Sequence, residues 1–451
     1  MLVVLLLPLG LALVTQVVRD PVSPGGDESI VELRVRDVGT SVTPAVGSYS
    51  RFGANHPGPA WFYVLVVPYR LLGSDHAALA AGTLIAGMAS LVAIALIVKR
   101  LGGMTLMIVA AAMLAVFVHS LGLSLVSSPW EPTGLILPCA ALLFLTLAAV
   151  EGTHLALPLV GAVACVLAQA QGTLAVFALA MGGLAVAASL VRLARVPDER
   201  RREVIALGLT ATLVLALWAP PLVQQVRGDP GNLTAFLRSI RDVDLPTLGL
   251  GPAWRLTAGQ LGAGGGWLGT DLPLHARTAV VDTAALPLLP LAVLPMIAGL
   301  VLSARDRSAR PARSLAGVVL VACAAAVASL SQLVGDLFLW IPSWTQVLGF
   351  GAWLAVGWCA IVLVRRWSPP VADRIVPAAL LVPLLLASLA TSKAALDTPD
   401  APPLTIAVQA LVEPTLAHLS GPVLVDSTVE HDTILGGTRL GLPELVLALD
   451  R

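Results

Sequence analysis

The chain has 451 residues, of which 57% are hydrophobic and only 12% are charged, and its mean hydropathy is +0.88. An average soluble protein carries about 25% charged residues, so this composition excludes an ordinary soluble domain. Lysine plus arginine equals aspartate plus glutamate, at 27 each, which excludes a broadly basic nucleic-acid surface. We therefore expect a membrane lipid, and no nucleic acid, among its partners.

Apolar runs long enough for a membrane helix, which needs about 20 residues, recur along the chain. They predict an all-α polytopic membrane protein with about 11 transmembrane helices. The first run lacks a preceding basic region and a small-residue cleavage site, so we interpret it as a retained helix. The runs lie at 2–18, 77–98, 104–123, 133–150, 155–170, 172–192, 203–220, 283–303, 314–333, 345–364 and 375–391.

The apolar segment 57–73 is predicted not to cross the membrane. It contains three prolines, which interrupt helices, and Trp and Tyr residues that favour the headgroup level. Lys and Arg collect in short cytoplasmic loops, and this rule supports the same interpretation. With 57–73 outside the count of spans, all four basic clusters fall on the cytoplasmic side, at 99–100, 192–202, 304–313 and 365–374.

The predicted organisation is a transmembrane domain, 1–391, followed by an extracytoplasmic tail, 392–451. The N-terminus is expected in the cytoplasm of a plasma-membrane protein, with large outer loops at 19–76 and 221–282. The tail has an apolar extended piece at 421–426 and is interpreted as the start of a small α/β domain. The four cysteines lie inside apolar runs without metal-binding spacing and are interpreted as buried hydrophobes.

The first outer loop holds the densest group of polar residues. Its sequence GGDESIVELRVRDVG (25–39) predicts a helix that starts near Asp27. Asp27 and Glu28 would then lie at the positive end of the helix dipole. A helix N-terminus with a solvated acidic face is the plain alternative to a functional site.

The stretch SYSRFGANHPGPAWFY (48–63) places Arg51, Asn55 and His56 directly before Pro-Gly-Pro and an aromatic cluster. Together with the acidic helix, it supplies two requirements of group transfer from a lipid phosphate. A carboxylate can take the proton of an acceptor hydroxyl. Cationic side chains can bind the departing phosphate.

These segments resemble the membrane-embedded GT-C glycosyltransferases, which take sugars from polyprenyl-phosphate carriers. That pattern has Asp-Glu on the first outer loop, a helix, then a basic residue followed by Pro-rich and aromatic residues and Phe/Leu-Gly. The corresponding pieces here are GGDES, SRFGANHPGPAWFY and RLLG (70–73). A closer resemblance, to actinobacterial GT-C-like membrane proteins, lies in SSPWEPTG (127–134) and APPLVQQVRGDPGN (219–232).

The resemblance implies a GT-C-like fold and an inverting transfer of a sugar from a polyprenyl-phosphate-linked donor. The implied acceptor is a cell-envelope glycan, glycolipid or protein outside the cytoplasm. Asp27 is implied as the base, with Glu28 as its neighbour. No firm cofactor is implied, and a divalent metal stays open without support from any residue pattern. The implied contacts to the donor phosphate are Arg51 and His56, supported by Tyr49 and Asn55, and the implied cavity-lining residues are Trp130, Glu131 and Gln171.

Two other functions remain open from the sequence. A transporter or lipid flippase would show repeated halves and polar helices at the midplane, whereas polar residues here gather at one membrane face. A non-catalytic scaffold is consistent with two departures from the pattern, Glu131 in place of Asn and Gln171 in place of His. His119 and Gln169, inside apolar runs, are interpreted as hydrogen-bonding groups within the bundle.

Overall fold

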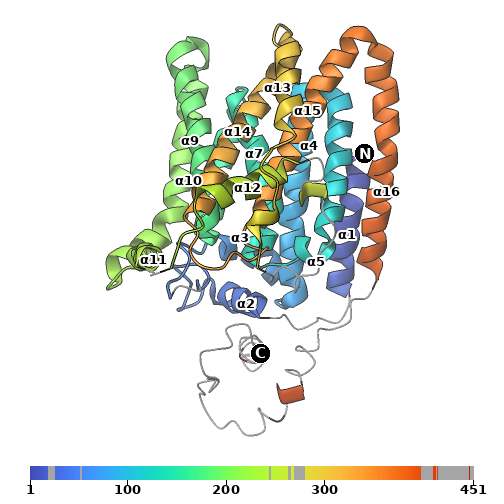
Figure 1. Ribbon diagram of the computed structural model, residues 1–451. Coiled ribbons are helices and arrows are strands. Elements are labelled where there is room, and N and C mark those ends of the chain that lie inside the picture. Colours follow the sequence, from blue (N-terminus) through green and yellow to red (C-terminus); the bar gives the residue numbers. More distant parts are fainter. Residues whose placement is uncertain are drawn as a thin grey trace.

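The computed structural model describes residues 1–18, 26–50, 53–242, 245–262, 266–268, 280–397, 410–412, 414 and 446. Long helices run side by side in one bundle (Figure 1). Within these residues, extended pairing is limited to isolated bridges, seven helices are long and apolar enough to cross a membrane, and four shorter helices are apolar. The predicted all-α polytopic membrane fold is therefore confirmed.

Within the described residues ten helices form the bundle and six others are peripheral. The peripheral helices lie mainly at one end of the bundle (Figure 1). The bundle helices are α1 (Leu2–Val18), α4 (His76–Leu121), α7 (Ile136–Val150), α8 (Ala156–Ala170), α9 (Gly172–Arg195), α10 (Arg200–Arg227), α13 (Val293–Leu302), α14 (Arg310–Ser331), α15 (Gln346–Trp367) and α16 (Val376–Leu396). The peripheral helices are α2 (Asp27–Asp37), α3 (Ala60–Leu71), α5 (Leu123–Val126), α6 (Glu131–Gly134), α11 (Asn232–Arg241) and α12 (Leu250–Gln260).

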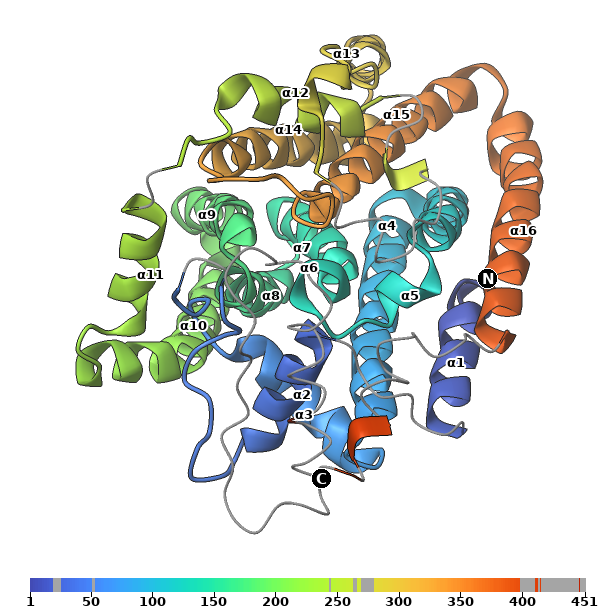
Figure 2. The ribbon, with the colours of Figure 1, turned by 60° about the horizontal axis from the view of Figure 1, so that its bottom comes forward.

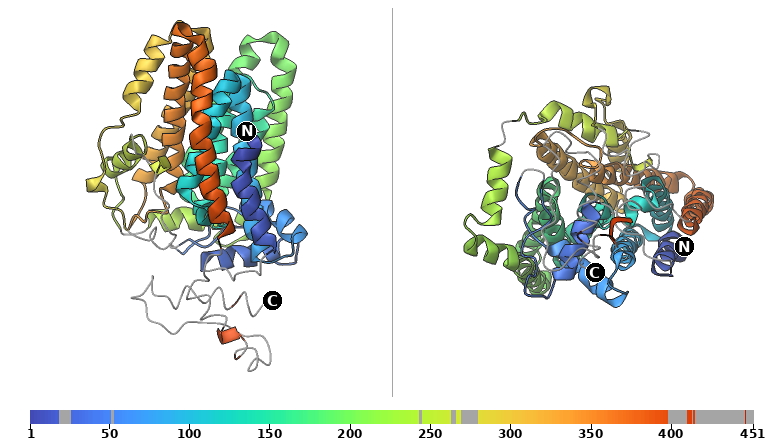
Figure 3. Two further views of the ribbon diagram at one scale, coloured as in Figure 1. Left: turned by 90° about the vertical axis from the view of Figure 1, so that its right-hand side faces the viewer. Right: turned by 90° about the horizontal axis from the view of Figure 1, so that it is seen from below.

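Helix α7 lies at the centre of the bundle, with every residue from 136 to 149 buried. Its Phe144 ring lies 5.7 Å from Phe350 on α15, which stacks at the same distance on Phe117 of α4. Helices α1 and α16, from opposite ends of the chain, pack side by side (Figure 3). The Thr15 hydroxyl donates to the Ala395 carbonyl at 3.2 Å. Large apolar side chains at helix crossings thus hold the bundle together.

Helix α4 contains two of the predicted spans, 77–98 and 104–123, joined by a turn. Gly103 has a φ of 79°, which glycine adopts without the steric cost of a β-carbon. Glu28 contacts His76 at the start of α4 and Ser128 just beyond its end, at 3.4 and 2.5 Å. The two halves of α4 therefore run in opposite directions, as two spans would.

The four basic clusters gather at the end of the bundle opposite α2, which we call the basic end (Figure 1). Arg365 pairs with Asp373 at 2.5 Å, and Thr105, close to the first cluster, donates to the same carboxylate at 3.2 Å. Arg366 pairs with Asp306 at 3.0 Å and so links the cluster 365–374 to the cluster 304–313. The prediction that these clusters share one side is confirmed, whereas their cytoplasmic orientation stays a prediction.

That orientation can be tested by cysteine labelling. The four natural cysteines are buried, so introduced cysteines give the signal. We expect a membrane-impermeant maleimide added to whole cells to modify Ser41→Cys, which is exposed near α2. Arg201→Cys, exposed at the basic end, should react only after the cells are permeabilised. Labelling of position 201 in intact cells would reverse the predicted topology.

Helix α3 agrees with the prediction that 57–73 does not span. Its 12 residues reach about 18 Å, far less than a bilayer core of about 30 Å. Its aromatic groups are used inside the protein rather than at a headgroup level. Trp61 Nε1 donates to the Pro129 carbonyl at 2.8 Å, and the Tyr63 hydroxyl donates to the Pro44 carbonyl at 2.6 Å. Helix α3 thus anchors the first loop to the bundle.

Two predicted boundaries are wrong. In the run 283–303 the α-helix begins only at Val293, after a short 3-10 turn at Thr283–Ala285, because Pro287 and Pro290 remove donors and clash with the preceding turn. Conversely, α10 continues through Pro220 and Pro221 to Arg227, seven residues past the predicted end at 220. Prolines are tolerated in such helices where neighbouring helices satisfy the freed groups. The predicted extended piece at 421–426 lies outside the described residues.

Candidate functional site

Helix α2 holds Glu28 and Glu32 against the bundle. The Ser128 hydroxyl donates to one oxygen of Glu28, whose other oxygen lies 3.4 Å from His76 Nε2. One turn further on, fully buried Glu32 accepts a hydrogen bond from Tyr69 at 3.0 Å and lies 3.7 Å from His76 Nδ1. Residues four apart share one helix face, so these contacts fix the rotation of α2. Asp27, one position earlier, points instead into a cavity.

The Asp27 side chain is exposed to this cavity, and the protein atoms around its carboxylate displace part of its solvation shell. Burial raises the pKa of Asp27 above its ordinary value, and the adjacent Glu28 carboxylate raises this pKa further. Among the described residues, no group donates a hydrogen bond to the Asp27 side chain. A carboxylate with a raised pKa and free oxygens is suited to accept a proton.

A short hairpin carries the second group of predicted residues. Tyr49 and Asn55 form an antiparallel bridge, and the His56 amide donates to the Ser48 carbonyl at 2.8 Å. The Asn232 side chain, at the start of α11, donates to the Asn55 and His56 carbonyls at 3.2 Å each and accepts from the Asn55 amide at 3.2 Å. The conspicuous GDPGN sequence therefore positions the hairpin.

His56 lies on the wall of the cavity. Burial lowers its pKa to about 4, so the imidazole is neutral near pH 7. Its ring centre lies 6.0 Å from that of Phe236 on α11, and its Nδ1 has no hydrogen-bond partner among the described residues. The Phe236 ring packs directly against the backbone of Gly172, where a β-carbon would lie only 2.9 Å from the ring. His56 thus offers a hydrogen bond rather than the positive charge that the sequence suggested.

The PWEP sequence forms another wall. Buried Glu131, the first residue of α6, accepts a hydrogen bond from the Ser48 hydroxyl. Trp130, just before it, packs against Trp340 with ring centres 5.0 Å apart and planes tilted by 51°. Trp340 belongs to the segment 332–342 that follows α14. Glu131, which stands where the GT-C-like pattern has Asn, thus joins the first loop to the bundle.

These walls enclose a cavity of about 510 Å³ at the α2 end, within the range of about 300–1,000 Å³ typical of ligand sites. Figure 2 brings this end forward, with α2 and α3 on one side, α11 on another and α12 and α14 on a third. Six predicted residues line the cavity: Asp27, Tyr49, His56, Trp130, Glu131 and Gln171.

Two predicted residues, Glu28 and Asn55, do not line it. The Glu28 side chain turns toward His76. The backbone carbonyl of Asn55 accepts a hydrogen bond from Asn232, which holds the hairpin in place. Arg51 lies outside the described residues. The sequence interpretation missed Trp340, Thr173 and Phe236, which also line the cavity. Isolated residues of these types carry no local signal of function.

The two glutamines near the end of α8 have different roles. The Gln169 side chain donates to the Leu217 carbonyl at 3.0 Å, and the Gln169 backbone carbonyl accepts from the Gly58 amide at 3.1 Å, as expected of a group that links helices. Gln171 is the one extended residue between α8 and α9 and lines the cavity. His119 contacts Thr391 at 3.2 Å, as expected for a histidine within the bundle.

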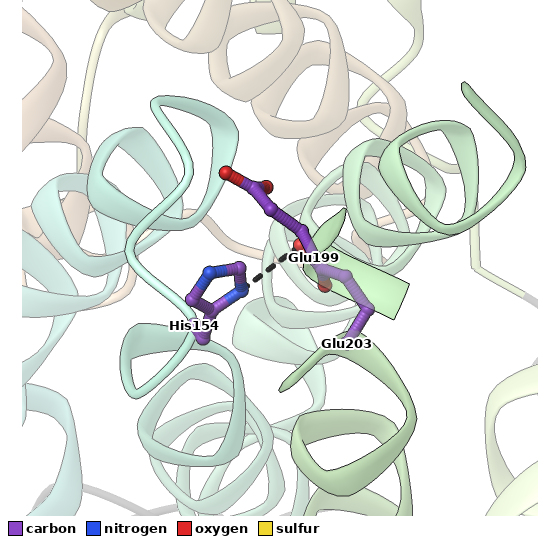
Figure 4. A group of neighbouring side chains, drawn as sticks. All are labelled: His154, Glu199 and Glu203. Atoms are coloured by element: carbon purple, nitrogen blue, oxygen red, sulfur yellow. Dashed lines mark ion pairs between the residues drawn. The ribbon is translucent and has the colours of Figure 1, made fainter. Parts of the chain in front are cut away.

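A different group of titratable residues, His154, Glu199 and Glu203, lies at the basic end (Figure 4). Fully buried Glu203 pairs with Arg192 Nε at 2.5 Å, and its Oε1 lies 3.0 Å from His154 Nδ1. The Ser189 hydroxyl donates to its other oxygen. Because Arg192 already supplies the compensating cation, the arrangement fits a structural ion pair rather than a metal centre.

Comparisons with known proteins add one decisive finding. No family model matches the chain, and no curated protein matches it in sequence. Among solved structures, ArnT from Cupriavidus metallidurans, crystallised with undecaprenyl phosphate, matches with a TM-score of 0.55 at 15% identity over 99% of this chain and 83% of ArnT. The fold is GT-C-like. A weaker match, with a TM-score of 0.44 at 13% identity, is an oligosaccharyltransferase from Archaeoglobus fulgidus, covering 91% of this chain and 55% of that protein.

The GT-C-like fold accounts for the organisation seen here. A polytopic bundle carries short helices at one end (Figure 3). The cavity lies at this end, lined by α2, α6 and α11 together with the ends of α9 and α14. At 15% identity the match concerns the fold, so any activity has to be argued from the residues of the cavity.

Proposed function

We propose that this protein is an integral membrane glycosyltransferase that transfers a sugar from a polyprenyl-phosphate donor to an extracytoplasmic acceptor. The observation that carries the proposal is the convergence of Asp27, His56 and Trp130 on one cavity of a GT-C-like fold. The ligand of the ArnT crystal, undecaprenyl phosphate, suggests the carrier class. The acceptor would be a glycan, glycolipid or protein of the cell envelope.

The chemistry assigned to Asp27 is general base catalysis. An acceptor hydroxyl oxygen attacks the anomeric carbon, the bond from that carbon to the phosphate oxygen breaks, and Asp27 takes the hydroxyl proton. The products are the glycosylated acceptor and sugar-free polyprenyl phosphate. A single displacement inverts the anomeric configuration. The raised pKa and free oxygens of Asp27 support this role.

The departing phosphate would bind at the hairpin 48–56. Its neutral His56 can donate one hydrogen bond, and Arg51 is the proposed cation. Tyr49, whose side chain is largely exposed beside the cavity, is placed to assist. Apolar neighbours from α9 and α11, including Val176 and Ile240, would contact the first isoprene units. The proposal thus assigns the phosphate to the hairpin and the first isoprene units to the apolar side chains of α9 and α11.

A transfer assay tests the proposed function. Purified protein in lipid nanodiscs is incubated with envelope acceptors and a panel of radiolabelled polyprenyl-phosphate pentoses and hexoses. We expect one donor to yield labelled acceptor and sugar-free carrier in equal amounts. A scaffold would give no product with any donor, and a flippase would move the intact donor across proteoliposomes without breaking its bond to phosphate.

Substitutions in the hairpin should weaken donor binding to different extents. A charge-assisted contact contributes about 1.5–3 kcal/mol, so Arg51→Ala should raise the Kd for polyprenyl phosphate by about ten- to a hundred-fold. A neutral hydrogen bond contributes about 0.5–1.5 kcal/mol, so His56→Ala should raise it by about two- to ten-fold. Arg201→Ala, at the basic end, is the matched control. An unchanged Kd for polyprenyl phosphate in both hairpin variants would show that the phosphate does not bind at this site.

A further inference from the structure

Trp130 and Trp340 form an aromatic corner in the cavity that the roles assigned above do not use. Their ring centres are 5.0 Å apart, and a third ring, Phe338, lies parallel to Trp340 at 6.4 Å. Both tryptophans line the cavity and remain partly exposed to it. Trp344 and Trp358, by contrast, are fully buried in the bundle.

The segment that carries Trp340 is held in place on both sides. Val334 pairs with Thr247, and Phe338 pairs with Val280. The Leu248 amide donates to the Leu333 carbonyl at 2.7 Å, and the Val281 amide donates to the Leu337 carbonyl at 2.8 Å. Trp340 is therefore presented on a fixed backbone, which limits the entropy lost when a ligand packs on it.

Unpartnered polar atoms lie on the wall formed by the start of α9. Gln171 Oε1 and Thr173 Oγ1 are buried and have no hydrogen-bond partner among the described residues, and both residues line the cavity. The Ser329 hydroxyl of α14 donates to the Thr173 carbonyl at 2.7 Å, which joins this wall to the helix that leads to Trp340. Leaving such groups unpaired costs free energy, so a ligand that pairs them gains affinity.

The aromatic faces and the unpaired polar atoms of these walls can be compared with the groups that three kinds of ligand offer. A lipid chain would use the aromatic faces but would leave Gln171 Oε1 and Thr173 Oγ1 unpaired. A phosphate offers only acceptors to the Gln171 carbonyl oxygen, which needs a donor. A pyranose ring satisfies both walls, because its C–H face can pack on the electron-rich face of an indole while its hydroxyls donate hydrogen bonds at the ring edge.

We infer that the Trp130–Trp340 corner and the Gln171–Thr173 wall form a subsite for a sugar ring, packed on Trp340 and hydrogen-bonded at its edge by Gln171. This inference rests on the proposed function for the source of the sugar, which is either the donor's own ring or the terminal ring of the acceptor. It assigns recognition to residues that take no part in proton removal or phosphate binding.

The test compares ligands with and without a sugar, using the full chain in nanodiscs. Kd values are measured for sugar-free undecaprenyl phosphate, for a panel of undecaprenyl-phosphate hexoses and pentoses, and for a panel of soluble cell-envelope oligosaccharides. The variants are Trp340→Ala, Trp340→Phe and Gln171→Leu. The matched control is Trp367→Ala, a tryptophan that is 88% exposed at the basic end.

We expect Trp340→Ala to weaken the sugar-bearing ligand by about three- to ten-fold, as loss of an aromatic contact implies, with Kd for sugar-free undecaprenyl phosphate unchanged. Trp340→Phe should retain most of the affinity, and Gln171→Leu should lose about as much as Trp340→Ala. An effect on the glycosylated lipids alone assigns the subsite to the donor ring. An effect on the oligosaccharides alone assigns it to the acceptor ring.

Equal Kd values for wild type and all three variants, with every sugar-bearing ligand, would overturn the subsite. So would a wild-type protein that binds no sugar better than its sugar-free counterpart. If Trp340→Ala also lowers thermal stability, Trp340→Phe and Gln171→Leu decide the outcome. Trp340-dependent binding of oligosaccharides by a protein that binds no polyprenyl phosphate would keep the subsite and refute the proposed function.

Discussion

Asp27→Asn should lower the rate of sugar transfer by about a hundred- to ten-thousand-fold, the range that a positioned general base contributes. The amide is nearly isosteric with the carboxylate but cannot take the acceptor proton. Within the described residues the Asp27 side chain makes no hydrogen bond or ion pair that the substitution would break, so expression, thermal stability and the Kd for the donor should stay close to wild type. Single-turnover transfer and equilibrium donor binding, measured on the same preparation, give both quantities.

Glu28→Gln is the matched control for this substitution. Glu28 lies one residue along α2 but turns away from the cavity toward Ser128 and His76. Its loss should disturb the seating of α2 and slow transfer less than Asp27→Asn. Full activity of Asp27→Asn together with an inactive Glu28→Gln would mean that the base is misassigned.

The pH dependence of the transfer rate also tests whether Asp27 is the base. Burial and Glu28 raise the pKa of Asp27, so its base form is lost at a higher pH than for an ordinary aspartate, near 4. Activity should therefore be present at neutral pH and fall, as the pH is lowered, through a pKa above that ordinary value. This acidic limb should be absent from the residual activity of Asp27→Asn.

Arg192→Ala should cause the largest loss of stability among single substitutions at the basic end. It removes the cation that neutralises Glu203, whose side chain is 0% exposed. Removing one partner of a buried ion pair costs about 3–5 kcal/mol, and His154 and Ser189 remain to offset part of it. We expect a loss near the lower figure, about 3 kcal/mol, in reversible unfolding with a denaturing detergent.

Two further variants show whether the loss of stability in Arg192→Ala comes from the unpaired charge of Glu203 or from lost packing. Replacing both partners, Arg192→Leu with Glu203→Leu, should recover most of the stability because no charge is left unpaired. Arg366→Ala, which breaks a partly exposed pair with Asp306, should cost no more than about 1 kcal/mol. A change below about 0.5 kcal/mol in Arg192→Ala would show that Glu203 is adequately solvated without it.

Sequence patterns predicted the helical bundle and much of the cavity for physical reasons. Long apolar runs have few alternatives to membrane helices, and the charge pattern correctly grouped the basic turns at one end. The α2 helix begins at Asp27 as predicted, preceded by Gly26. The motifs around His56, Trp130 and Gln171, separated by up to 115 residues, meet at one cavity because they all lie at helix ends on the same side.

The rest required the three-dimensional structure. Trp340 lies in a segment with no motif, and its importance comes only from its contact with Trp130, 210 residues earlier. The neutral state of His56 follows from burial, whereas its neighbours in sequence suggested a cation. Asn232 was visible within GDPGN, but its hydrogen bonds to the hairpin depend on how α10 and α11 are placed.

A cryo-electron microscopy structure of Asp27→Asn in nanodiscs with its polyprenyl-phosphate sugar would show directly how the donor lies relative to position 27. This variant should bind the donor without consuming it. We expect phosphate density beside the hairpin 48–56 and the sugar in the 510 Å³ cavity. The anomeric carbon should face position 27, with space between them for an acceptor hydroxyl. An empty cavity, with the donor phosphate bound elsewhere on a protein of confirmed transfer activity, would contradict the proposed site.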